Sequence, residues 1–228
     1  MKEKDLVNLN NVNSDPVELM LDFIHKDYDD STNSKKVLKT LTSSNSDEHN
    51  TPSYLIEAAR EVLGAIDLDP MSNDLANETV RATTYYTKED EGLSKDWFGN
   101  VWLNPPFSLS KLAIPKLVNS YEKQEINQGV LLVKSDVSTQ KYKLLYPYPF
   151  CELDKRVKFI DNSENLRYQS KTPQGSPFPV VMFYLGRNYY LWNKVMSRYG
   201  KVHPGNHLFT RLAMRNNLGD LKDLGIIE

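Results

Sequence analysis

The sequence predicts an α/β fold on a mainly parallel sheet with helices on both faces. Three observations underlie this prediction. Short apolar runs typical of strands alternate with amphipathic segments typical of helices, an order that favours β-α-β units. Residues 130–133 are apolar throughout, as expected for a strand covered on both faces. Polar residues follow two other runs directly, at Asp69 and Asn104, and open α/β sheets bind their ligands at such strand ends.

Length and composition restrict the class of protein. A chain of 228 residues is long enough for one domain and an appendage. It contains no run of about 18 apolar residues, so we expect no membrane span. The beginning of the chain lacks the apolar region of a signal peptide, and the single Cys151 cannot form an internal disulfide. We therefore expect a cytoplasmic protein in which Cys151 is a core residue.

Charge is distributed unevenly along the chain. The net charge is −2, but residues 1–129 carry 13 Lys and Arg against 22 Asp and Glu, whereas residues 130–228 carry 15 against 8. The two parts therefore have charges of −9 and +7. This asymmetry permits a basic face for nucleic acid on an acidic protein, although a solvated basic surface is the plain alternative.

The first 48 residues are predicted to be an appendage. Asp15 and Pro16 form a good helix start, and residues 42–48 have the Ser, Thr and Asn content of a flexible linker. Residues 49–228 are expected to form the domain that contains the site. Within it, Thr51 is the expected N-cap of a helix that ends at Gly64. The other expected helices are 72–82, 114–123, 136–145 and 189–199, and the expected strands are 65–70, 85–87, 101–103, 130–133, 156–160 and 180–184.

The turn that follows residues 101–103 is the strongest candidate for chemistry. Pro105 and Pro106 lack N–H donors and fix φ, so the chain leaves the sheet as a stiff turn. We expect the Asn104 side-chain oxygen and the Pro105 carbonyl to point together as two acceptors, with the ring of Phe107 beside them. Two acceptors and an aromatic face suit a flat group bearing NH₂, such as a nucleobase. A proline-rich loop with a purely structural role is the alternative.

Asp67 and Asp69 alternate along a short strand, so they should share one of its sides. Such carboxylates often receive hydroxyl or amino groups of a ligand, although a solvated strand end is equally compatible with the pattern. A divalent ion would need further ligands that the nearby sequence does not offer. His203 and His207 are four residues apart, but a Pro-Gly pair between them breaks the helix that would align them. We therefore expect no metal site.

An ordered series of motifs resembles the Dam-like DNA adenine methyltransferases of phages and prophages over roughly residues 46–200. The series consists of Thr51-Pro52, residues 64–70 (GAIDLDP), Tyr86-Thr87, residues 90–93 (DEGL), Trp97, residues 101–107 (VWLNPPF), 131–133 (LLV), 156–159 (RVKF) and 173–175 (PQG).

The resemblance implies a Rossmann-like sheet that uses S-adenosylmethionine, and it implies roles for particular residues. Two departures from the family pattern stand out: residues 71–73 (MSN) replace the glycine-rich loop that many methyltransferases have, and Phe107 replaces a commoner Tyr. Whether Asp67 or Asp69 contacts the cofactor stays open. The implied residues are, for gripping the adenine, Asn104, Pro105, Pro106 and Phe107, and, for the cofactor, Thr51, Pro52, Asp67, Asp69 and Pro70. The uneven charge and the polar loop with Arg167 and Lys171 lead us to expect a DNA face in residues 130–228. The residues expected to contact DNA are Phe107, Ser108, Lys134, Arg156, Arg167 and Lys171.

The expected function is methylation of the exocyclic amino group of adenine in DNA, on a base that has been flipped out of the duplex. Two alternatives stay open at the level of sequence. One is a catalytically inactive DNA-binding protein on the same fold, and the other is an amino-group methyltransferase that acts on RNA or on protein glutamine. The sequence specifies neither the recognition site nor the oligomeric state.

Overall fold

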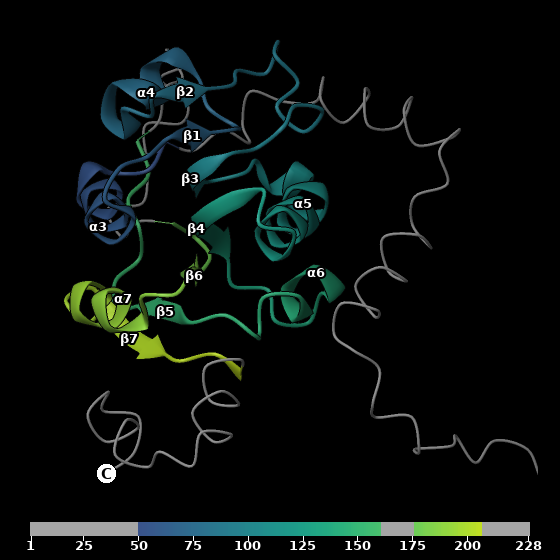
Figure 1. Ribbon diagram of the computed structural model, residues 1–228. Coiled ribbons are helices and arrows are strands. Elements are labelled where there is room, and N and C mark those ends of the chain that lie inside the picture. Colours follow the sequence, from purple (N-terminus) through teal and green to yellow (C-terminus); the bar gives the residue numbers. More distant parts are fainter. Residues whose placement is uncertain (1–49, 161–175, 207–228) are drawn as a thin grey trace, which may run out of the picture. The chain divides into compact units, whose positions relative to one another are not determined.

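The computed structural model describes residues 50–160 and 176–206 (Figure 1). All of them belong to the second of the two units into which the chain divides, Ser43–Glu228. The expected appendage, Arg167, Lys171 and His207 lie outside the described residues. No helix in the described part combines the length and the apolar character that crossing a membrane requires.

The described residues form one mixed sheet and the helices that cover it. The strands are β1 (Leu68–Asp69), β2 (Thr84–Tyr85), β3 (Gly99–Leu103), β4 (Ile126–Lys134), β5 (Phe150–Leu153), β6 (Val180–Leu185) and β7 (Gly200–His203). The helices are α3 (Ser53–Leu63), α4 (Asp74–Val80), the 3-10 turn η1 (Phe107–Leu109), α5 (Ser110–Glu122), α6 (Gln140–Lys143) and α7 (Tyr189–Met196).

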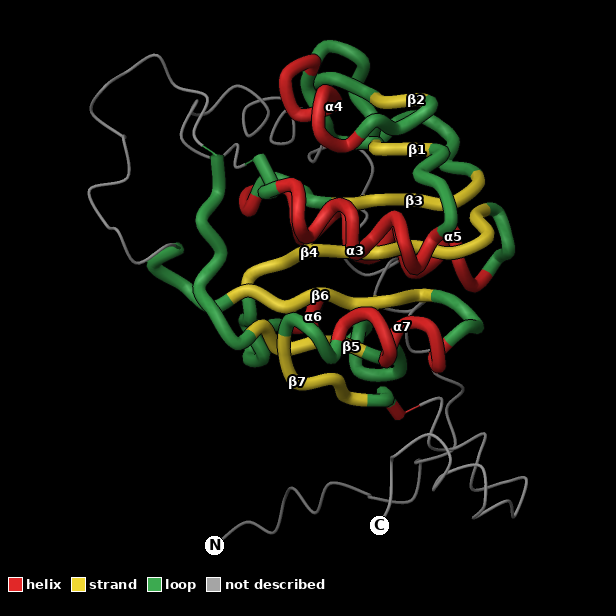
Figure 2. The backbone as a smooth tube through the Cα atoms, turned by 90° about the vertical axis from the view of Figure 1, so that its left-hand side faces the viewer, coloured by secondary structure: helices red, strands yellow, loops and turns green. Residues whose placement is uncertain are grey.

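The strand order is β2-β1-β3-β4-β6-β5-β7 (Figure 2). Strands β2, β1, β3 and β4 are parallel, whereas the pairings of β6 with β4, of β5 with β6 and of β7 with β5 are antiparallel. The prediction of a mainly parallel sheet is therefore wrong for half of the sheet. A strand buried on both faces, as β6 is along its whole length, reads as a continuous apolar run in either direction, so its sequence does not reveal its orientation.

Helices cover both faces of the sheet, as expected. Helices α3 and α7 lie on one face and α5 and α6 on the other (Figures 1 and 2). Helix α5 packs closely against β4. A Cβ added to Gly129 of β4 would lie only 3.1 Å from the side chain of Leu117 in α5. Trp102 and Trp192 are among the largest fully buried side chains, and Cys151 is fully buried as predicted. This core holds the strand ends in fixed positions.

Two strands in the second half of the chain differ from the prediction. The pattern of residues 156–160 predicts a strand, but they make only an isolated bridge between Ile160 and Asn50. Their exposed charged residues, Arg156 and Lys158, lie on a segment that runs over the surface. The strand in this region is instead β5. It begins directly after Pro149 and is only four residues long, so its sequence shows no clear strand pattern. β7, for which the sequence contains no clear signal, pairs with β5.

Several helix boundaries differ from the prediction; α4 and α7, for example, are shorter than expected. The expected helix 136–145 is reduced to α6, and the residues before it form a turn. Helix α5 begins at Ser110, earlier than expected, and contains Pro115. At α3 the N-cap is Pro52, and no side chain caps the helix, so Thr51 has another role.

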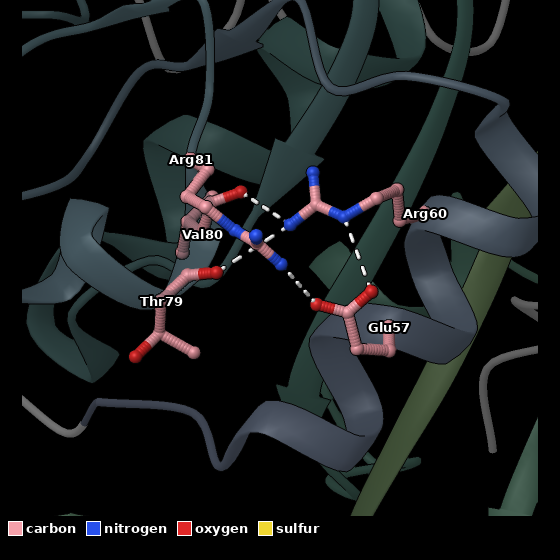
Figure 3. Close-up of polar contacts among 5 residues, drawn as sticks. All are labelled: Glu57, Arg60, Thr79, Val80 and Arg81. Carbon is pink, nitrogen blue, oxygen red and sulfur yellow. Dashed lines mark hydrogen bonds and ion pairs between the residues drawn. The ribbon is translucent and has the colours of Figure 1, made fainter.

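An arginine joins α3 to the end of α4 (Figure 3). The Arg60 guanidinium donates to the carbonyl oxygens of Val80 at 2.8 Å and Thr79 at 3.4 Å. Glu57 accepts from Arg60 at 3.3 Å and from Arg81 at 2.7 Å. Because the last carbonyls of a helix have no partner within it, Arg60 satisfies the end of α4 and fixes that helix against α3.

Candidate active site

The carboxyl ends of the parallel strands bring the predicted residues to one edge of the sheet. β1 ends at Asp69, β3 ends directly before Asn104, and β4 ends at Lys134. The antiparallel strand β6 begins at this edge, since Val180 lies opposite Lys134. Residues far apart in the sequence therefore meet where an α/β sheet binds its ligands.

The turn after β3 is held from two sides. The Asn104 side-chain nitrogen donates to the Thr51 hydroxyl at 3.1 Å, and Thr51 itself is buried. Beyond the prolines, the Pro106 carbonyl accepts from the backbone of Leu109 at 2.9 Å and from the Ser110 hydroxyl at 3.3 Å. The carboxamide is thus oriented by its nitrogen, and the turn passes directly into η1 and α5.

Phe107 belongs to a small aromatic cluster with a cation. Its ring meets the ring of Phe178 edge to face, with centroids 4.7 Å apart and an interplanar angle of 88°. The Lys134 ammonium lies 5.4 Å from the centroid of Phe178. This cluster joins the turn after β3 to the end of β4 and to the segment before β6. Sequence reasoning misses Phe178, because an aromatic between two prolines gives little signal of this role.

Asp69 is a buried acid at the end of β1, only 3% exposed. Its carboxylate accepts from the backbone N–H of Met71 at 3.3 Å. Burial raises the pKa of this carboxyl to about 7, and the Met71 hydrogen bond opposes only part of that rise. The group therefore changes charge near neutral pH and is sensitive to any donor or cation placed beside it.

Asp67 has a different position. Its carboxylate accepts from the backbone N–H of Asn100 at 2.7 Å, at the beginning of β3 and so away from the edge where Asn104 lies. Gly99 has a φ of +63°, and a Cβ there would lie 2.6 Å from the Asp67 carboxylate. Asp67 thus directly precedes β1 and holds the beginning of β3, whereas Asp69 is the last residue of β1.

The loop between β2 and β3 lies against the end of β1. A Cβ on Gly92 would lie 1.9 Å from the Pro70 carbonyl oxygen, so only glycine permits this approach. The Trp97 indole donates to the Gly92 carbonyl at 2.8 Å. The Lys116 ammonium donates to the carbonyls of Leu93 at 2.9 Å and Lys95 at 2.7 Å. The motif at residues 90–97 thereby supports the turn that follows Asp69.

The remaining predicted residues are placed as follows. Ser108 lies in η1, and Pro105 is buried. Arg156 donates to the Ser176 carbonyl at 3.3 Å, next to the Phe178 segment. His203 contacts Glu152 at 3.1 Å on β5. Within residues 50–160 and 176–206, no three His, Cys, Asp or Glu side chains gather in a way that could hold a metal ion.

A mixed α/β sheet with this polar edge is compatible with a methyltransferase fold. The family model described as DNA N-6-adenine-methyltransferase (Dam) matches residues 38–189, about two thirds of the chain. The chain therefore belongs to the Dam family of DNA adenine methyltransferases, which confirms the family predicted from its motifs. Neither the curated proteins nor the solved structures contain a match to this chain.

Proposed function

We propose that this protein transfers a methyl group from S-adenosylmethionine to the exocyclic amino nitrogen of adenine in DNA. The main support is the contact between Asn104 and Thr51, which orients the carboxamide beside Phe107 at the carboxyl edge of the sheet. The family to which the chain belongs has the same substrate class.

The residues at this edge fit the proposed cofactor. Asp69 offers a carboxylate, buried at the end of β1, to the hydroxyl or amino groups of a ligand, and Thr51, Pro52 and Pro70 lie in the neighbouring segments. These four residues would hold S-adenosylmethionine, which supplies an activated methyl group on a sulfonium. Asp67 is the weaker candidate, because its carboxylate already accepts from Asn100.

Asn104 and the turn would act on the adenine itself. The adenine amino nitrogen is a poor nucleophile because its lone pair is delocalised into the ring. The Asn104 side-chain oxygen and the Pro105 carbonyl accept its two hydrogens, which favours a tetrahedral nitrogen and stabilises the positive charge that develops on it. Phe107 offers its ring face to the flipped base. Lys134, Arg156 and Ser108, with Arg167 and Lys171 outside the described residues, are proposed to contact the DNA.

The test is to sequence DNA from cells that express the protein, with a read-out of modified adenines, and then to repeat the experiment with Asn104→Ala. Loss of one acceptor that acts as charge develops should lower turnover on the order of a hundredfold. The affinity for S-adenosylmethionine, measured by calorimetry, should barely change. Asn127→Ala is a matched control, because Asn127 is exposed near the opposite end of β4.

The two alternatives give different results in the same experiments. An inactive DNA-binding protein binds DNA without transferring methyl groups and shows no heat with S-adenosylmethionine. An enzyme for another amino group methylates RNA or a glutamine-containing protein in a substrate panel and leaves DNA unmodified. If Asn104→Ala methylates DNA at the wild-type rate, the turn after β3 is a structural loop and the proposed mechanism is wrong.

A further inference from the structure

The turn between β4 and α6, residues 136–139, displays an apolar side chain that the proposed chemistry does not use. Val137 is 59% exposed, one of the most exposed apolar side chains of the described residues. A single exposed apolar residue is ordinary on a protein surface. Val137 differs from such residues in two ways: it lies near the proposed site, and hydrogen bonds fix the turn that carries it.

The turn stands at the edge that contains the proposed site. Lys134 ends β4, and the next residue, Ser135, still donates from its backbone to the Pro179 carbonyl at 2.9 Å. Lys134 contacts Phe178, which in turn contacts Phe107. Val137 therefore lies in the turn three residues after Lys134, and β4 itself extends beyond its last pair with β3, at Leu131.

The turn is fixed by its own hydrogen bonds. The Asp136 carbonyl accepts from the backbone and from the hydroxyl of Thr139, at 3.2 and 2.9 Å. The Asp136 carboxylate accepts from the Ser138 hydroxyl at 2.9 Å. These bonds join the residues before and after Val137 and so fix the backbone of the turn. The branched side chain of Val137 has few rotamers of its own. The apolar group is thus presented in a defined position.

A chain of tyrosines connects the turn to the core. The Tyr146 hydroxyl donates to the Val137 carbonyl at 3.2 Å. The ring of Tyr146 contacts that of Tyr142, which is buried and meets Phe183 of β6 at a centroid distance of 5.4 Å. The backbone at Val137 is therefore connected to the central sheet through Tyr146 and Tyr142.

The charges around the turn suit a nucleic acid. Lys134 precedes it, and Lys141 and Lys143 follow it in α6, against the single acid Asp136. In the described part of the chain none of these lysines forms an ion pair with a carboxylate. Cations around an apolar tip are the features that DNA-bending proteins use, since the cations hold phosphates while the apolar group enters the stack.

We propose that Val137 is a wedge that enters the DNA base stack when the target adenine leaves it. This inference rests on the proposed function, because it requires a base that is taken out of a duplex. Extruding a base breaks stacking and pairing, and a rigid apolar side chain that fills the gap restores part of the lost contact. Val137 then acts on the duplex and its opening, not on the methyl transfer itself.

The experiment compares two forms of one substrate, a synthetic oligonucleotide that contains the methylated sequence found in expressing cells. Methylation by full-length wild type, Val137→Ser and Val137→Leu is measured on the duplex and on the single strand. We expect Val137→Ser to lose about tenfold in kcat/KM on the duplex and to match wild type on the single strand. Val137→Leu keeps an apolar tip and should retain activity on both. Tyr190→Ser is the control, because Tyr190 is 63% exposed at the start of α7.

A second measurement follows base extrusion directly. With 2-aminopurine at the target position of the duplex, wild type should raise the fluorescence and Val137→Ser should raise it less. Equal losses on both substrates, or no loss on the duplex, would overturn the inference. So would a wild-type enzyme that methylates single strands alone, although the proposed function would then stand. Absence of methylation by wild type on either substrate overturns the proposed function itself.

Discussion

At the scale of single residues, the contact between Thr51 and Asn104 connects two motifs that are 53 positions apart. The sequence pattern favours Thr51 as a helix cap, but its hydroxyl accepts from the Asn104 carboxamide instead. An amide that donates through its nitrogen has its oxygen directed away from that donor. We therefore propose Thr51 as a positioning residue that orients the Asn104 carboxamide.

Thr51→Val tests this role with little change in shape. Loss of the hydroxyl leaves the Asn104 nitrogen without this acceptor in a partly buried place, so the carboxamide should rotate more freely. We expect kcat for DNA methylation to fall about tenfold, the effect of roughly one hydrogen bond. Thr51→Ser keeps the hydroxyl and should restore most of the rate. Equal rates for the valine and serine variants, at equal melting temperatures, would remove Thr51 from this role.

At the scale of elements, the first half of the sheet is more predictable than the second. Residues 101–103 and 130–133 are recognisable as strands because apolar runs end at clear breakers. β5 is hidden because its four residues follow two prolines and include an exposed Glu152. Segment 156–160 has a strand-like pattern, but only Ile160 and Asn50 form a bridge. Whether a segment pairs as a strand depends on the strands beside it, and the local sequence carries no information about those neighbours.

The contact between α3 and α4 offers a prediction at the same scale. Arg60 is 22% exposed and bonds the last carbonyls of α4, whereas its partner Glu57 is 51% exposed. Arg60→Met keeps the apolar stem of the side chain and removes the donors. We expect the free energy of unfolding to fall by about 1–2 kcal/mol, measured by urea denaturation. Glu57→Gln removes only exposed ion pairs and should cost less than about 0.5 kcal/mol. The opposite ranking would show that the ion pairs, not the carbonyl bonds, hold the two helices together.

At the scale of the whole molecule, the edge that gathers Asp69, Asn104 and Lys134 follows from the parallel half of the sheet. The sequence identifies these three residues because each comes at the end of a strand or directly after one. The sequence does not identify Phe178, because it precedes the antiparallel strand β6, whose direction the sequence does not reveal. It does not identify Val137 either, because that residue is distinguished by its exposure, which only the structure shows. Positive charges outnumber negative ones in residues 130–228, and Lys134 and Arg156 are described residues of that part of the chain. Sequence therefore predicts which residues lie at this edge of the parallel strands better than it predicts the segments that surround them.

Asp69 links this site to the stability of the molecule as a whole. Its pKa is about 7 in the folded protein, whereas the ordinary pKa of an aspartate is 3.8. Between these values the folded state keeps a proton that the unfolded state releases, so stability should fall as pH rises from about 4 to about 7. A difference of about three pKa values corresponds to at most about 4 kcal/mol. Urea denaturation across this range should show the decrease in wild type, and Asp69→Asn should lack it.

The same titration should appear in ligand binding, with the opposite sign. A ligand that donates hydrogen bonds to Asp69 favours the carboxylate and lowers its pKa, so the affinity for S-adenosylmethionine should rise as pH increases through about 7. Calorimetry at about pH 6 and about pH 8, on either side of that pKa, measures this change, and Asp69→Asn should bind weakly at both values. Asp90 does not contribute to this change, because hydrogen bonds from Thr87 hold its pKa below the ordinary value of 3.8, so it stays ionised at both pH values. A wild-type affinity that is the same at both pH values, in a protein whose stability still depends on Asp69, would place this acid in the core and outside the cofactor site.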